Sequence, residues 1–107
     1  MEKLEIDNFI DAIHLLDTAL SYDTPHRKVK TRLIHFIKER TTSLEEELNE
    51  LSFLNSREMQ SKYELALNHF LILSNRLKLE YSMQKPILKT FAFYDLAHHH
   101  YNDIKKV

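Results

Sequence analysis

Residues 59–77 read MQSKYELALNHFLILSNRL, and this stretch decides the fold class. Its apolar residues recur at alternating intervals of four and three positions, which places their side chains on one face of an α-helix. The stripe consists of Met59, Tyr63, Ala66, Phe70, Leu73 and Leu77, widened by Leu67 and Ile72. We therefore expect an amphipathic helix of about 25 residues, nearly 38 Å long at about 1.5 Å per residue. It should end at Ser82-Met83-Gln84-Lys85-Pro86, because a residue before proline is pushed out of the helical region.

Two other segments of the chain repeat the helical period. The first covers about residues 3–21, with apolar positions at Ile6, Phe9, Ile13, Leu16 and Leu20. Thr24-Pro25 ends that helix and begins the next, because threonine suits the N-cap and proline suits the first helical position. The last helix is expected over about residues 86–105. These segments predict helices joined by short corners.

The stretch that follows Pro25 has two interpretations. Ser43 and Glu46 stand in the register of a capping box, and glutamates 45–47 suit the first turn of a new helix. Thr41-Thr42-Ser43 would then be a break or kink, with a third helical segment from about residue 44 to 54. The alternative is one long helix that runs through three poor helix formers. We favour the break.

Glycine is absent from all 107 residues, and this supports a helical fold. Glycine is the usual residue in primed hairpin turns, β-bulges and nucleotide-binding loops. We predict a single all-α domain over residues 1–107, an antiparallel bundle of four long helical stretches, or five helices if the 41–43 corner breaks. The corners must turn without glycine, and Asn55 is the first choice for a residue with positive φ.

Composition restricts the classes of function. The chain has no cysteine, a formal net charge of -1, and a longest strongly apolar run of only residues 70–73. The N-terminus lacks the basic and apolar regions of a signal peptide, so we expect a soluble cytoplasmic protein with no membrane partner. Without glycine and cysteine, the phosphate loops, the nucleophile elbow and the cysteine–histidine mechanisms are excluded. We expect no enzymatic activity, no cofactor and no small-molecule substrate.

A basic face on residues 26–40 is the first candidate binding surface. Six lysine and arginine residues stand there against one glutamate, and the candidate anion or nucleic-acid ligands are Arg27, Lys28, Arg32, His35 and Lys38. Such a face suits phosphates or an acidic protein, or it can be a solvated face that pairs with the acidic segments 1–23 and 41–50. A helix-turn-helix over 26–53 is disfavoured, because its second helix would bring glutamates to the DNA phosphates.

The histidine triplet at residues 98–100 is the second candidate. Adjacent side chains on a helix point about 100° apart, so three consecutive imidazoles cannot bind one ion. Helical spacing instead aligns Asp95, His99 and Asp103, and a metal would need further ligands such as His69 or His14 from another helix. We expect surface pairing of His99 with its carboxylates and no metal site.

The last helix is the third candidate, because apolar residues occupy more than half of its circumference. Either its neighbours cover it on several sides, or Phe91, Tyr94 and Tyr101 bind another protein chain. We favour a non-enzymatic protein–protein interaction module, such as a small regulator, adaptor, inhibitor or immunity-type factor, which binds another protein or forms a homodimer. The alternative function is nucleic-acid binding by the basic face.

Overall fold

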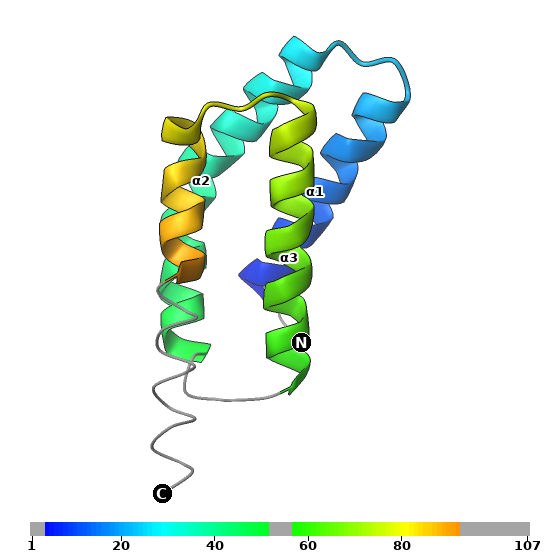
Figure 1. The fold of residues 1–107 in the computed structure, drawn as a ribbon. Helices are drawn as coiled ribbons and strands as arrows, with labels where there is room; N and C mark the ends of the chain where they lie inside the picture. Colours follow the sequence, from blue (N-terminus) through cyan, green and yellow to red (C-terminus); the bar gives the residue numbers. More distant parts are fainter. Residues whose placement is uncertain (1–3, 52–56, 93–107) are drawn as a thin grey trace, which may run out of the picture.

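The computed structural model describes residues 4–51 and 57–92 and confirms the all-helical bundle. Three helices are α1 (Glu5–Ser21), α2 (His26–Leu51) and α3 (Arg57–Arg76), and a fourth covers residues 81–92 (Figure 1). No strand occurs within these ranges. The expected continuation of the last helix to residue 105 lies outside the described residues, as does Asn55.

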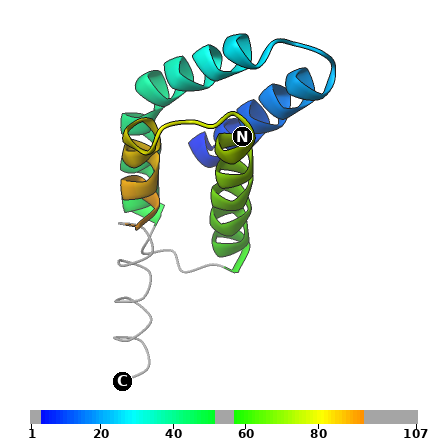
Figure 2. The same ribbon diagram turned by 45° about the horizontal axis from the view of Figure 1, so that its top comes forward.

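Consecutive helices run in alternating directions, but the neighbours in space do not all alternate. α1 packs against both α2 and α3. Contacts along α1 and α3 advance together, from Asp7 with Lys62 to Asp17 with Arg76, so these two helices are parallel. The helix over residues 81–92 lies beside α2, as Figures 1 and 2 show. Four helices thus enclose one core.

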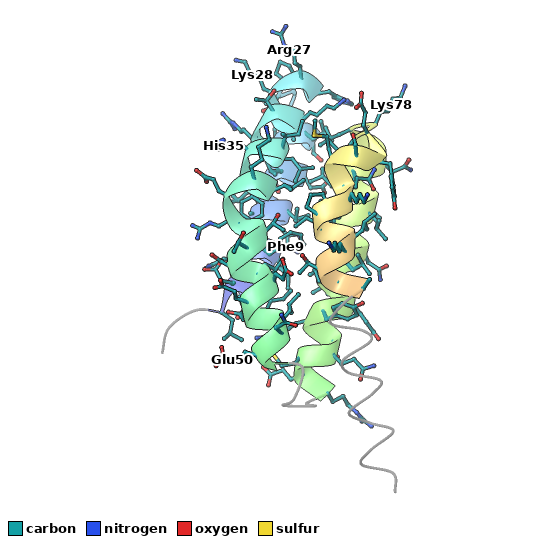
Figure 3. The ribbon with its side chains drawn as sticks, turned by 90° about the vertical axis from the view of Figure 1, so that its left-hand side faces the viewer. Phe9, Arg27, Lys28, His35, Glu50 and Lys78 are labelled. Carbon is teal, nitrogen blue, oxygen red and sulfur yellow. The ribbon has the colours of Figure 1, made fainter. Side chains whose placement is uncertain are left out.

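Phe9 of α1 lies at the centre of that core, enclosed by the helices (Figure 3). Its ring centroid is 5.8 Å from that of Phe36, 5.9 Å from that of Phe70 and 5.8 Å from that of Phe91. The predicted stripe is confirmed at six positions, all buried: Met59, Tyr63, Ala66, Phe70 and Leu73 of α3, and Leu77 directly after it. Of the two residues expected to widen it, Leu67 packs against the core, whereas Ile72 is 58% exposed. Every helix therefore contributes an aromatic ring to one cluster.

α2 is a single helix of 26 residues, and the predicted break at Thr41-Thr42-Ser43 is wrong. Its buried stripe continues through the expected corner, with Val29, Leu33, Ile37, Leu44 and Leu48 all inside the core. The Thr41 hydroxyl donates to the Ile37 carbonyl one turn earlier, so the helix itself satisfies this polar group. Burial of the stripe outweighs the weak helix propensity of three residues.

Glu47 caps the N-terminus of α1 from the far end of α2. The amide of Glu5 donates to Glu47 Oε2 at 2.6 Å, and the amide of Ile6 donates to Glu47 Oε1 at 2.9 Å. Leu4 stands at the N-cap of α1 and offers no side-chain acceptor. Glu47 therefore satisfies two amide donors that a helix leaves unpaired at its start.

Within residues 4–51 and 57–92, Asp23 with φ 67° and Lys78 with φ 53° adopt the left-handed conformation at helix ends. After α3, the amide of Leu79 donates to the Ser74 carbonyl at 2.9 Å and that of Lys78 donates to the Asn75 carbonyl at 3.1 Å. This is a Schellman motif with Lys78 at the position that glycine usually occupies. The 6→1 bond recurs after α1, where the Thr24 amide donates to the Ala19 carbonyl at 3.1 Å.

The predicted stop at residues 82–86 is wrong, because α3 ends earlier. The Schellman turn at residues 77–79 reverses the chain with both Leu77 and Leu79 buried, and the next helix already includes Pro86. The Glu80 carbonyl accepts hydrogen bonds from two amides in the first turn of that helix, from Met83 at 2.9 Å and from Gln84 at 3.2 Å. A turn anchored by two buried leucines overrides the pre-proline preference.

Replacing Glu47 with alanine should lower the free energy of unfolding by about 1–2 kcal/mol, because two charge-assisted hydrogen bonds to the start of α1 are lost. Urea denaturation measures this change. Glu46 is the control, because it is adjacent and exposed; its alanine variant should stay within about 0.5 kcal/mol of the wild type. Equal losses in the two variants would contradict the capping role.

Replacing Lys78 with glycine should raise the free energy of unfolding by about 0.5–1 kcal/mol, because glycine adopts positive φ without the steric cost of a Cβ atom. Lys78→Ala keeps the Cβ atom and should give no gain. Lys89→Gly, at an exposed helical position, should lose about 1 kcal/mol. A loss of stability in Lys78→Gly would refute the strain at this turn.

Candidate protein-binding groove

An apolar groove of about 550 Å³ runs along the outside of the bundle between α1 and α2. It is lined by five residues of α1, between positions 12 and 19, and by Arg32 and Phe36 of α2. The α1 lining consists of Ala12, Leu15, Leu16, Thr18 and Ala19. We call this feature the α1/α2 groove.

The α1/α2 groove forms because the apolar part of α1 is wider than its core stripe. Leu15 is 71% exposed, whereas each leucine of the core is less than 10% exposed. Ala12 and Ala19 stand on either side of Leu15 at helical intervals, and their small side chains leave the space unfilled. Sequence reasoning missed this surface; the signal was Ala12, Leu15 and Ala19 at i, i+3 and i+7 beside the core stripe.

A basic hollow of about 340 Å³ adjoins the α1/α2 groove on the first turns of α2. It is lined by Arg27, Lys28, Thr31 and Arg32, and Arg32 belongs to both features. Figure 3 shows Arg27 and Lys28 extending away from the bundle. The apolar groove thus continues into a positively charged surface.

The structure separates the five predicted basic ligands. Arg27, Lys28 and Arg32 share the basic hollow, whereas Lys38 lines a different hollow of about 220 Å³ between α2 and the helix over 81–92. His35 Nε2 lies 3.0 Å from Glu39 Oε1 on the exposed side of α2. The first three residues therefore form the cluster that can act together.

In the described residues, the acidic segments neutralise only part of the basic segment. Arg40 is 3.7 Å from Glu5, but no carboxylate in residues 4–51 and 57–92 forms an ion pair with Arg27, Lys28 or Arg32. Two carboxylates of α1 pair with α3 instead: Asp7 with Lys62 at 3.1 Å, and Asp17 with Arg76. The hydrogen bond from Lys62 to Asp7 is the main reason that the pKa of this lysine is raised.

Phe91 was a candidate partner-binding residue, and the structure places it in the core instead. Its side chain is 1% exposed, and its ring centroid is 5.1 Å from that of Tyr63. The Tyr63 hydroxyl also donates to the Phe91 carbonyl at 3.0 Å. α1 and α3 cover this side of the last helix, so Phe91 is not available to a partner. Tyr94 and Tyr101, the other two candidates, lie outside the described residues.

The carboxylate–histidine stripe of the last helix also falls beyond the described part of the chain. This applies to Asp95, His99 and Asp103 and to the remaining histidines of the triplet. In residues 4–51 and 57–92, no group of three or more histidine, aspartate or glutamate side chains is placed to hold a metal ion.

Phe91→Ala should lower the free energy of unfolding by about 3–5 kcal/mol, because it empties a fully buried aromatic site. Tyr81→Ala is the matched control on the same helix, since Tyr81 is 69% exposed, and it should change stability by less than about 0.5 kcal/mol. Thermal or urea unfolding of the two variants measures these changes in stability. A near-neutral Phe91→Ala would return this residue to the candidate interface.

Comparison of the chain with protein-family models, curated proteins and solved structures found no match. Among the described residues, no helix is both long and apolar enough to cross a membrane. The α1/α2 groove and the basic hollow beside it are the surface features that bear on function.

Proposed function

We propose that the protein is a non-enzymatic interaction module whose α1/α2 groove binds an acidic amphipathic helix of a partner protein. The observation that carries this proposal is the junction of an apolar groove with a basic cluster that has no ion-pair partner in the described residues. Such a role suits a small cytoplasmic regulator, adaptor, inhibitor or immunity-type factor.

The apolar groove favours a helix as the bound element. Helical ligands place anchors at i, i+3 or i+4, and i+7 into a hydrophobic groove on their target. The groove has a comparable repeat of its own on α1, where Ala12, Leu15 and Ala19 lie along its length. Leu15, exposed in the free protein, would gain most from being covered, because burying a leucine is worth about 1.5–3 kcal/mol.

The basic cluster favours acidic residues on that helix. Arg27, Lys28 and Arg32 lie at one end of the groove, and their charges would attract glutamates or aspartates on the ligand's polar face. Complementary charges of this kind accelerate association and fix the direction in which the helix lies. Arg32, which also lines the groove, would touch both faces of such a ligand.

Nucleic-acid binding is the competing function, supported by the same three cations. Two observations disfavour it. The apolar groove next to the cluster offers phosphates no hydrogen-bond donors or charges along most of its length. Glu45, Glu46 and Glu50 are exposed farther along α2, where they would repel an extended polyanion. Only a short stretch of backbone phosphates could be contacted.

The proposal predicts which helical peptides this protein selects. From a phage-displayed library of helical 16-residue peptides, selection on tag-free protein should enrich sequences with an apolar stripe flanked by glutamate and aspartate. Leu15→Asp should weaken their binding at least about tenfold, because it puts a charge into the groove and repels the acidic flank. Arg32→Ala should chiefly lower the association rate and its salt dependence.

Ile72→Asp is the control for this experiment. Ile72 is 58% exposed on α3 and does not line the groove, so its variant should bind the selected peptides as the wild type does. Enriched peptides that bind Leu15→Asp equally well, or no enrichment at all, would overturn the proposal.

Two further measurements separate the rival functions. Steep salt-dependent binding of a generic 20-nucleotide RNA or DNA, lost in Arg27→Ala/Lys28→Ala/Arg32→Ala, would favour the nucleic-acid function. Sedimentation of the free protein tests self-association: a dimer that Leu15→Asp dissociates would show that the groove binds a second copy of this chain.

A further inference from the structure

We propose that His14 of α1 and His69 of α3 form a two-histidine site for a divalent transition metal ion such as Zn²⁺, Ni²⁺ or Cu²⁺. The structure brings these residues together from helices that are separated in sequence by the whole of α2. This site is independent of the α1/α2 groove, which lies on the other flank of α1.

The two imidazole rings are spaced for shared coordination. Their centroids are 4.6 Å apart, with an angle of 57° between the ring planes. Two imidazoles that bind one tetrahedral ion at about 2.0–2.1 Å per nitrogen hold their centroids roughly 5 Å apart. The observed centroid distance is therefore close to the one that shared coordination requires.

The contact belongs to a row of paired side chains along the parallel α1–α3 interface. Lys62 pairs with Asp7 before it and Arg76 pairs with Asp17 after it. On α3 the three positions 62, 69 and 76 are seven residues apart, so they share one face of the helix. The two flanking ion pairs fix the alignment of α1 and α3, and the two histidines are held opposite each other between them.

The surroundings permit a cation at this position. His14 is exposed and His69 is half-buried, so an ion can reach the rings from solvent and keep water molecules as its other ligands. The charges of Lys62 and Arg76 are balanced by Asp7 and Asp17. Because no third protein ligand is placed at the pair within the described residues, we expect a two-histidine site and not a closed structural site.

The chemistry of the pair selects the class of metal. Neutral imidazole nitrogen is a good ligand for zinc, nickel and copper, whereas magnesium and calcium prefer oxygen. Protonation of imidazole competes with the metal, so binding should weaken as the pH is lowered. The bound ion would cross-link α1 to α3 and would stabilise the folded chain, since the pair is assembled only in that state.

Thermal unfolding of the full-length, tag-free protein tests the site. At about pH 7.5, saturating ZnCl₂ or NiCl₂ should raise Tm by at least about 4 °C over the EDTA-treated protein. His14→Ala and His69→Ala should each abolish the rise, and lowering the pH to about 5.5 should do the same to the wild type.

Two control variants keep the assignment specific. His35→Ala removes an exposed histidine of α2 that lies beside Glu39, and its metal-induced rise should be retained. A variant with alanine at residues 98–100 removes the sequence triplet and should also retain it. Each comparison uses the difference between metal and EDTA, so a change in the metal-free stability of a variant does not affect the result.

Three outcomes would overturn the proposal. They are an unchanged wild-type Tm with either metal, a rise of equal size in His14→Ala or His69→Ala, and a rise that disappears when residues 98–100 are replaced. The last outcome would assign the metal to the histidine triplet.

Discussion

The uninterrupted length of α2 is the constraint on which this bundle depends. A helix of 26 residues extends about 39 Å, and only this length carries Glu47 back to the first turn of α1. Glu47 then satisfies the amides of Glu5 and Ile6, for which α1 has no local acceptor. A break at Thr41 would release this cap and divide the buried stripe that positions α2 against Phe9.

The two halves of α2 carry opposite charge and make different contacts. The acidic second half of α2 supplies the tertiary cap, and Arg40 at its middle pairs with Glu5. In the basic first half, Arg27, Lys28 and Arg32 form no ion pair within the described residues and lie at the surface. In a chain whose charges nearly balance, a local excess of this kind is more informative about binding than the net charge.

The sequence was sufficient for the helical class, the α3 stripe and the corner before Pro25, because local periodicity and helix-end chemistry determine all three. It was misleading at Thr41-Thr42-Ser43 and at Pro86, where tertiary burial of Leu44, Leu48 and Leu79 outweighs local propensity. Phe91 was misjudged for a related reason: a broad apolar helix predicts covering neighbours and an exposed interface equally well. The sequence singled out Arg27, Lys28 and Arg32 and named His14 and His69 as candidate ligands. The α1/α2 groove and the contact between the two histidines depend on which helices lie side by side, which local patterns do not determine.

α1 links these observations, because both candidate sites use it. At about 100° per residue, its buried stripe around Ile13 separates two flanks. One flank carries Leu15 toward α2 and the α1/α2 groove, and the other carries His14 toward α3. Two adjacent residues of one helix, about 100° apart around its axis, therefore belong to two different candidate sites. The parallel packing of α1 and α3 makes this possible: it pairs His14 with His69 and leaves the α2 side of α1 to form the groove.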